Sequence, residues 1–267
     1  MLAVCALIFL PSLSFPFVSD DYIHVTNALQ AGVSALNASL TQSGADRFFR
    51  PLGYWSYYVD SLWAGWSPVR WHLLDILLHL ANCFLIFWVA KKMDLTAQGA
   101  LIATAIFAFH GSHVEAVAWL AARFDLLAAF FVLLGVYLFL EYVRTTRAAY
   151  LCWSVACCAL SLLCKEAAYC FPLLLFPVLG FRKAFSKRGL HLILPYFLVT
   201  FIAFIYRWSV VGGIGGYQTN GHATALKFHL ILTLKALLLR MWAVLFYPVN
   251  WSTAPGITLG ILGLLYA

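Results

Sequence analysis

The stretch from Trp71 to Ala90, WHLLDILLHLANCFLIFWVA, decides the class of fold, because it is apolar over the length of a bilayer-crossing helix. Its one carboxylate belongs to Asp75, and two lysines follow directly at positions 91 and 92. His72, Asp75 and His79 share one face of such a helix, since residues three and four apart are neighbours there. We expect this face to meet other helices through hydrogen bonds rather than to meet lipid.

The same pattern extends along the whole chain, which is 64% hydrophobic and 10% charged, whereas a soluble domain has about 25% charged residues. Further apolar segments of roughly spanning length cover residues 1–18, 96–112, 125–141, 149–164, 168–181, 191–206 and 228–247. The sequence therefore predicts an all-α fold, a polytopic transmembrane helix bundle. A last apolar run begins near Gly256 and stops at Ala267. We expect one module over residues 1–267, with about eight or nine spans, truncated within the last of them.

The basic residues lie in short links between the apolar segments. Three links are basic, namely Lys91-Lys92, Arg144 with Arg147, and Arg182-Lys183 with Lys187-Arg188. They fall at every second link, so the positive-inside rule puts all three on the cytoplasmic side. The net charge of +7 is thereby explained without nucleic acid, which we exclude as a partner. Residues 19–70 and 207–227 then become outer loops of a multi-pass integral membrane protein, in the inner (plasma) membrane if the protein is bacterial.

Two adjacent carboxylates, Asp20 and Asp21, follow the first apolar segment directly. An acidic pair at a bilayer boundary is costly to hold, so it marks a first place to look for chemistry. The basic links place it on the non-cytoplasmic side. After this pair in the sequence, residues 22–40 are expected to form a helix that lies at the membrane interface.

A second polar stretch, residues 109–125, lies within a region otherwise suited to lipid. On a continuous helix, Glu115, Trp119 and Arg123 would run down one face, with Glu115 paired to Arg123 directly or through a bound anion. Two interpretations stay open for this stretch: a buried ion pair that locks two helices together, and the polar wall of an active site. We favour the wall, which would also include His110 and His113.

Metal binding is not expected from these residues. The spacing of His110 and His113 would suit a metal, but a lone pair of histidines is a weak signal. The seven cysteines lie in apolar stretches without paired spacing, which is typical of small core residues. Lys165, next to Glu166 between two apolar segments, could offer a point charge to a phosphate. The alternative for these two residues is an ordinary interfacial ion pair.

The order of these motifs resembles that of the GT-C class of membrane glycosyltransferases, and most of all the tetratricopeptide-containing transmembrane O-mannosyltransferases and their bacterial relatives. The resemblance covers most of residues 19–180. It is carried by Asp20-Asp21, Arg50-Pro51-Leu52, Trp71-His72-Leu73-Leu74-Asp75 with His79, Phe109-His110, His113-Val114-Glu115-Ala116-Val117-Ala118-Trp119, Arg123-Phe124-Asp125-Leu126-Leu127, Cys164-Lys165-Glu166 and Pro172. The chain has Gly111 where this class often has proline.

The resemblance implies an inverting transfer of a sugar from a polyprenyl or dolichyl phosphate-linked donor to a protein or glycan acceptor on the non-cytoplasmic side. It implies a GT-C-type bundle whose long first outer loop bears interfacial helices. Asp20 would be the general base, with Asp21 in support, while Arg123 and Lys165 would face the donor phosphate. The wall of the substrate site would comprise His110, His113, Glu115, Trp119 and Glu166. No cofactor is expected, and a divalent metal, which some members use, is not favoured.

A transporter or lipid-linked sugar flippase is the alternative. Such a protein would use Glu115, Arg123 and Asp75 as a coupling path through the bilayer. Transporters often consist of two repeated halves with broken helices, but no internal repeat stands out here. The charged groups gather on one face of the membrane, which favours an enzyme.

Overall fold

The computed structural model describes residues 1–30, 33–42, 48–182 and 187–213, and short pieces at 218–219, 222–223, 235 and 238–239. The described residues are mainly helical, with two short strands, β1 (Gln218–Thr219) and β2 (His222–Ala223), which pair antiparallel. The predicted all-α fold is confirmed.

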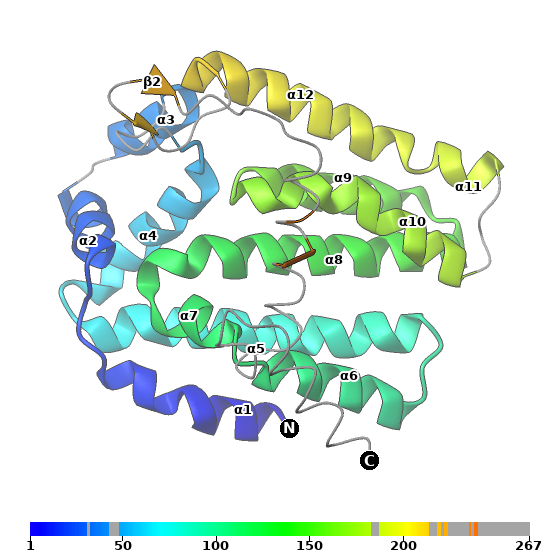
Figure 1. Ribbon diagram of the computed structural model, residues 1–267, viewed down its shortest axis with the longest axis horizontal. Coiled ribbons are helices and arrows are strands. Elements are labelled where there is room, and N and C mark those ends of the chain that lie inside the picture. Colours follow the sequence, from blue (N-terminus) through cyan, green and yellow to red (C-terminus); the bar gives the residue numbers. More distant parts are fainter. Residues whose placement is uncertain are drawn as a thin grey trace.

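The first half of the chain forms the N-terminal helix, a group of three shorter helices and a long hairpin (Figure 1). Its elements are α1 (Leu2–Phe9), η1 (Leu10–Ser14), α2 (Asp20–Gln30), α3 (Val33–Thr41), α4 (Pro51–Ala64), α5 (Pro68–Lys92) and α6 (Ala97–Phe109). The helix expected over residues 22–40 is described as two elements, α2 and α3, and residues 31 and 32 between them lie outside the described residues.

The second half continues the bundle. Its elements are α7 (His113–Ala118), η2 (Leu120–Ala122), α8 (Arg123–Thr145), α9 (Ala148–Leu162), η3 (Glu166–Cys170), α10 (Phe171–Phe181), α11 (Lys187–His191) and α12 (Leu194–Val211). The outer loop was expected to start at residue 207, but α12 continues to Val211, so the predicted start is too early. The helix ends at Gly212, whose φ of 72° suits the left-handed cap that glycine favours. Most of residues 214–227, and all but three residues of the apolar segment 228–247, lie outside the described residues.

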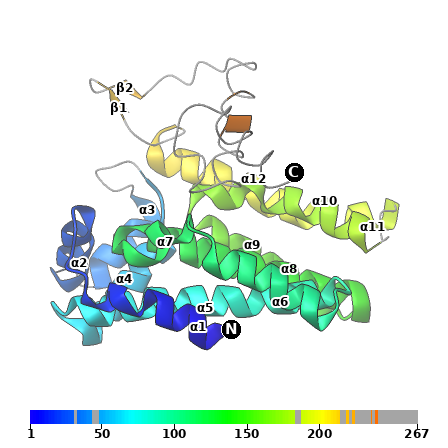
Figure 2. The same cartoon turned by 60° about the horizontal axis from the view of Figure 1, so that its bottom comes forward.

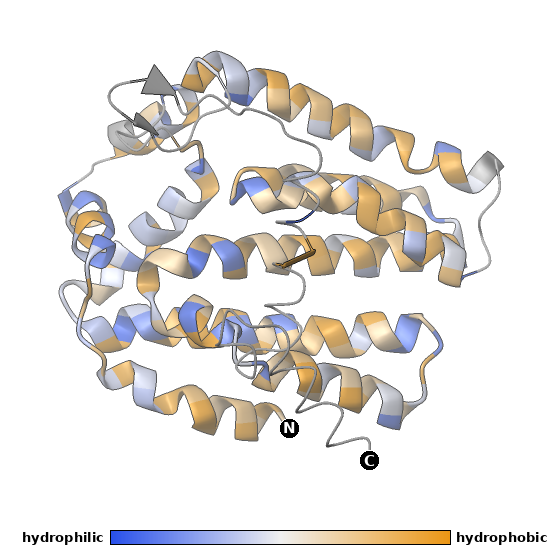
Figure 3. Cartoon of the chain, viewed as in Figure 1, coloured by the Kyte–Doolittle hydropathy of each residue, from blue (hydrophilic) through white to orange (hydrophobic). Residues whose placement is uncertain are grey.

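Among the described residues, three helical segments are long and apolar enough to cross a membrane: Pro68–Lys92, Leu120–Thr145 and Gly189–Val211. Shorter apolar segments cover Leu2–Ser14, Ala97–Phe109, Ala148–Leu162 and Glu166–Phe181. The protein is accordingly a membrane protein with a helical bundle. Figure 3 shows that the middle parts of the long helices are mostly hydrophobic.

The core lies where α8 packs against α9 and α5, with α6 on α5 and α12 on α9 (Figure 2). The close approach depends on Gly135, because a Cβ there would lie 2.7 Å from the ring of Phe171. The Phe171 ring stacks on Tyr196, at 5.6 Å between centroids. The Tyr196 hydroxyl donates to Ser154 (2.6 Å), and the Ser154 hydroxyl donates to the carbonyl of Gly135. Small and aromatic side chains thus join α8, α9, α10 and α12.

Ion pairs tie the links together at one end of the bundle. Lys92 and Arg144 both pair with Glu141, and Arg182 pairs with Asp94. The basic links that the sequence assigned to one side of the membrane therefore lie at the same end of the bundle.

The links at the opposite end are joined in the same way. Glu166 pairs with Arg50 (2.8 Å) and with Arg207 (3.3 Å), and Lys165 pairs with Asp125. The alternation of the links, which was inferred from charge alone, is present in the fold.

Candidate active site

The polar stretch 109–125 is not one helix. Helix α7 ends at Ala118, Trp119 is extended (φ −104°, ψ 112°), and α8 begins at Arg123. The expected single face of Glu115, Trp119 and Arg123 is therefore wrong, and so is the expected pairing of Glu115 with Arg123. The sequence did not reveal the break, because the hydrogen bonds that hold the following turn come from distant residues. Asp21 accepts one from the Ala121 N–H, and the Leu120 carbonyl accepts one from the Tyr57 hydroxyl.

Arg123 is fully buried and takes its partners from α4 and α5. Its Nε donates to Asp75 (2.6 Å), its Nη1 to Asp60 (2.5 Å), and its Nη2 to the carbonyl oxygen of Trp71 (2.9 Å). The guanidinium also lies over the ring of Tyr57, 4.8 Å from its centroid. Arg123 thus forms a buried ion pair, but with Asp60 and Asp75 and not with Glu115, the partner that the sequence suggested. Arg123, which begins α8, is thereby bonded to both α4 and α5.

The acidic pair has two unlike members. Asp21 is buried, and its carboxylate accepts hydrogen bonds from the backbone N–H groups of Val18 and Ala121, each at 2.9 Å. Burial raises the pKa of the Asp21 carboxyl, although both hydrogen bonds act to lower it. Asp20 is exposed and faces a cavity. Asp21 thus anchors the start of α2, and this anchor positions Asp20.

The cavity beside Asp20 has a volume of about 550 Å³ and lies at the end of the bundle where α2, α4 and α7 gather (Figure 1). We call it the polar cavity. It is lined by Asp20, Ile23, His24, Asn27, Phe48, Arg50, Tyr54, Glu115, Trp119, Ala121, Ala122, Phe124, Asp125 and Lys165. The structure therefore brings together four of the residues predicted from sequence: Asp20, Glu115, Trp119 and Lys165. Arg123 and Asp21 lie behind its wall.

Two cations line the polar cavity. Lys165 pairs with Asp125. Arg50 pairs with Glu166 and lies over the ring of Phe48, 4.1 Å from its centroid. Arg50 had no site role in the sequence analysis, although it stood in one of the quoted motifs. The signal that could have found it is its place directly before Pro51, which opens α4.

A second cavity, of about 440 Å³, adjoins the polar cavity and shares Glu115, Ala122 and Asp125 with it. We call it the apolar cavity, because most of its other lining residues are apolar: Phe107, Ala116, Leu126, Ala128, Ala129, Val132, Ala167, Ala168 and Leu174. His113 lines it as well. Two chemically different compartments therefore meet at Glu115 and Asp125.

The two predicted wall histidines lie beyond the polar cavity. The His113 ring contacts Phe107, with 4.4 Å between centroids. Burial, with His79 and His110 nearby, lowers the pKa of His113 to about 4. The Nδ1 of His110 lies 2.7 Å from the hydroxyl of Ser112. Glu166 does not line the polar cavity either. It forms an ion pair with Arg50, which does line it.

Known proteins with similar sequences are protein O-mannosyl-transferases. Tmtc1 of Drosophila melanogaster is 30% identical over 176 residues, which are 62% of this chain and 20% of the relative. The tmtc2 protein of Xenopus laevis is 32% identical over 120 residues (45% and 14%), and TMTC2 of Homo sapiens is 31% identical over 132 residues (48% and 16%). The chain is a relative of the protein O-mannosyl-transferases. The resemblance read from the motifs is thereby confirmed.

The chain spans between 14% and 20% of the length of these three relatives. No family model matches it, and no solved structure matches it. The relatives therefore support a relation to the protein O-mannosyl-transferases, and they assign no residue of either cavity.

Proposed function

We propose that this protein is an inverting glycosyltransferase that moves a hexose, with mannose as the first candidate, from a polyprenyl or dolichyl phosphate to a hydroxyl group of a protein or glycan acceptor. The observation that carries the proposal is the polar cavity, in which Asp20 stands on α2 while Lys165 and Arg50 come from other elements. A displacement at an anomeric carbon needs opposite charges on the two sides of one sugar, and this cavity offers both.

Asp20 is the proposed general base. A hydroxyl group is a poor nucleophile until a positioned carboxylate takes its proton. The Asp20 carboxylate is exposed at the cavity, whereas both carboxylate oxygens of Asp21 are engaged by backbone N–H groups. One base suffices for a single displacement with inversion, so the mechanism proposed here uses no covalent intermediate and no cofactor.

Lys165 and Arg50 are the proposed partners of the donor phosphate. The lipid phosphate gains charge as it leaves, and fixed cations stabilise that charge in the transition state. Both cations are held by carboxylates, Asp125 and Glu166, so a bound phosphate would take over part of this pairing. Arg123, which the resemblance assigned to the phosphate, already donates to three acceptors inside the protein. We therefore assign it to support of the site.

The apolar cavity is the proposed place for the first isoprene units of the donor, because it opens from the same residues that border the polar cavity. The site would face the non-cytoplasmic side, since the basic links lie at the other end of the bundle. The protein would act as a multi-pass membrane enzyme, with residues 1–267 as one module.

Sugar transfer by purified protein in lipid nanodiscs tests the proposal. The assay supplies radiolabelled polyprenyl phosphate mannose and a peptide rich in serine and threonine. General-base catalysis contributes about 10²–10⁴ in rate, so Asp20→Asn should lower turnover at least a hundredfold. The matched control is Asp94→Asn, an exposed carboxylate at the opposite end, which should transfer sugar at the original rate.

Full transfer activity in Asp20→Asn would overturn the assignment of the base. Movement of the intact donor across liposome membranes, without turnover, would favour the flippase instead.

A further inference from the structure

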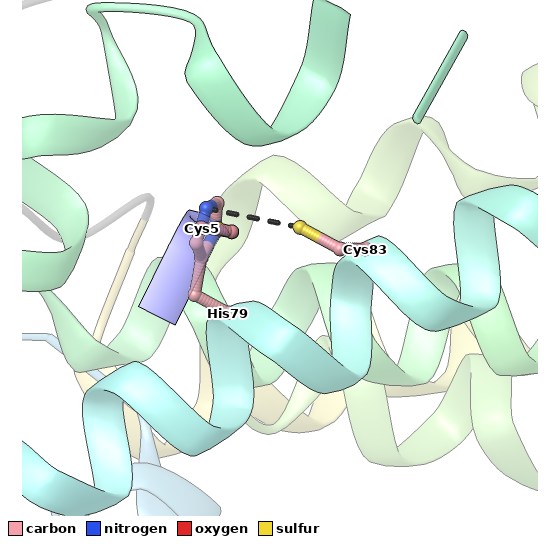
Figure 4. Close-up of side chains that lie close together, drawn as sticks. All are labelled: Cys5, His79 and Cys83. Atoms are coloured by element: carbon pink, nitrogen blue, oxygen red, sulfur yellow. Dashed lines mark hydrogen bonds between the residues drawn. The ribbon is translucent and has the colours of Figure 1, made fainter. Parts of the chain in front are cut away.

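Three side chains that the proposed reaction does not use lie together at the contact between α1 and α5 (Figure 4). They are Cys5 from α1 and His79 and Cys83 from α5. Their ligand atoms, two sulfurs and one ring nitrogen, all lie within 4.8 Å of one another. All three residues are buried, with exposed fractions of 0%, 1% and 0%. Atoms this close need little adjustment to bind one metal ion, whose bonds to sulfur and nitrogen are about 2.0–2.3 Å long.

The positions of the three residues follow from the helices. His79 and Cys83 are four residues apart, so they project from the same face of α5. The His79 Nε2 lies 3.8 Å from the Cys83 sulfur. Cys5 comes from the first helix, which packs along α5. Both cysteines are free thiols. The cluster therefore joins two helices that are far apart in the sequence.

The His79 ring has one nitrogen with a backbone partner and one without. Its Nε2 lies 3.2 Å from the carbonyl oxygen of Ala108. Its Nδ1 is buried and has no hydrogen-bond partner within the described residues. The nitrogen that lies near the Cys83 sulfur is also Nε2, so a metal bound there would replace the contact of Nε2 with the Ala108 carbonyl. The free Nδ1 could then carry the proton of the neutral ring.

The surroundings favour a soft ion in a neutral complex. The two cysteines share a hydrophobic cluster with Phe9, Ile76, Ala108, Val117 and Leu126. Charge is expensive to bury in such surroundings. Two thiolates and one neutral imidazole carry a charge of −2, which one zinc(II) ion cancels. Thiolate and imidazole are also the ligands that zinc prefers, over the carboxylate oxygens that suit magnesium or calcium.

We propose that Cys5, His79 and Cys83 bind a structural zinc(II) ion that fastens α1 to α5. Binding releases the two thiol protons and forms two Zn–S bonds and one Zn–N bond. The fourth ligand of a tetrahedral site would come from His113, whose ring centroid lies 5.5 Å from that of His79. None of these four residues lines the polar cavity in the described part of the chain. Cys5, His79 and Cys83 line neither the polar nor the apolar cavity, and His113 alone reaches the apolar cavity. Zinc binding and sugar transfer are measured by different readouts, so either proposal can fail without the other.

Metal content and the cobalt(II) spectrum of the full chain test this proposal. The protein is purified in detergent under reducing conditions, stripped with a chelator, and reloaded with zinc(II) or cobalt(II). We expect one zinc per chain, a thermal midpoint that rises on loading and falls again with chelator, and a sulfur-to-cobalt charge-transfer band. Cys5→Ser and Cys83→Ser should each lower bound metal at least tenfold. The control Cys157→Ser, a buried thiol in α9, should bind metal as the original chain does.

Three results would overturn the site. They are a reloaded chain with far less than one zinc and no thermal shift, a Cys5→Ser/Cys83→Ser double variant that retains the charge-transfer band, and a Cys5–Cys83 disulfide in the untreated protein. The zinc content and thermal shift of the original chain need no variant, so the test stands even if a substitution prevents folding.

Discussion

The Asp21 carboxylate accepts a hydrogen bond from the backbone N–H of Ala121, one hundred positions further along the chain, at 2.9 Å. This bond links the start of α2 to the short η2 turn that separates α7 from α8. The turn also carries Leu120, whose carbonyl oxygen accepts a hydrogen bond from the Tyr57 hydroxyl (2.7 Å). Both walls of the polar cavity therefore depend on the same three-residue turn.

Asp21→Asn should weaken both stability and catalysis. An amide has one acceptor oxygen, so one of the two backbone N–H groups would face an NH₂ group and lose its partner. Leaving a buried donor unsatisfied costs about 1–3 kcal/mol. We expect a lower thermal midpoint, and a fall in kcat with little change in donor KM, because Asp20 shifts while the cations stay in place. An unchanged kcat would contradict the positioning role, and Asp94→Asn serves as the control.

Lys165→Ala and Arg50→Ala should raise the donor KM, each by about 10- to 100-fold, which corresponds to the loss of one hydrogen bond to a charged group. Steady-state kinetics with varied lipid-linked donor measure this effect. Lys92→Ala is the matched control, because Lys92 also pairs with a carboxylate, Glu141, but at the opposite end of the bundle. Equal donor KM values in all three variants would contradict the proposed binding of the donor phosphate by Lys165 and Arg50.

Arg123→Met should destabilise the fold strongly. The substitution leaves the carboxylates of Asp60 and Asp75 buried without their cation, and breaking a buried pair in this way costs about 3–5 kcal/mol. Chemical unfolding in mixed micelles measures the loss. Arg144→Met is the control, since the Arg144 side chain is 60% exposed beside its partner Glu141 and should cost less than about 1 kcal/mol. Similar losses in the two variants would contradict the central place of Arg123.

Gly53→Ala should be poorly tolerated, because an added Cβ would lie 2.1 Å from the ring of Phe124. Phe124 is buried, and the rings of His24, Tyr54 and Tyr57 pack edge-to-face against it. Overpacking of this kind costs about 1–3 kcal/mol. Gly180→Ala is the control, since its Cβ would meet nothing within 4 Å. Thermal midpoints of the two variants check the prediction, which fails if they shift alike.

Asp60 should make the protein less stable as the pH rises. Burial raises the pKa of its carboxyl above the ordinary value, with Arg123 acting in the opposite direction. Above the ordinary pKa the unfolded chain has already lost this proton while the folded chain still holds it, so stability falls as the pH rises through the raised folded pKa. Asp60→Asn should flatten the dependence of the free energy of unfolding on pH in the range above the ordinary aspartate pKa of about 3.9. If the free energy of unfolding of Asp60→Asn depends on pH as steeply as that of the original chain, the raised pKa of Asp60 is contradicted.

Much of the architecture was accessible from the sequence. Apolar length predicted the helices that became α5, α8 and α12, because a membrane-crossing segment is defined by its own composition. The alternation of basic links predicted which links share an end of the bundle. That inference in turn placed Asp20 and Lys165 together, as the lining of the polar cavity now shows.

The sequence alone could not assign partners across helices. It paired Arg123 with Glu115 by helical spacing, whereas the structure breaks the helix at Trp119 and pairs Arg123 with Asp60 and Asp75. It treated Cys5 and Cys83 as unrelated core residues, whereas the packing of α1 on α5 brings them together around His79. Periodicity reports only which residues share a face of one helix. Which faces meet is decided by the packing of whole helices, and so the tertiary structure alone determined the site's partners.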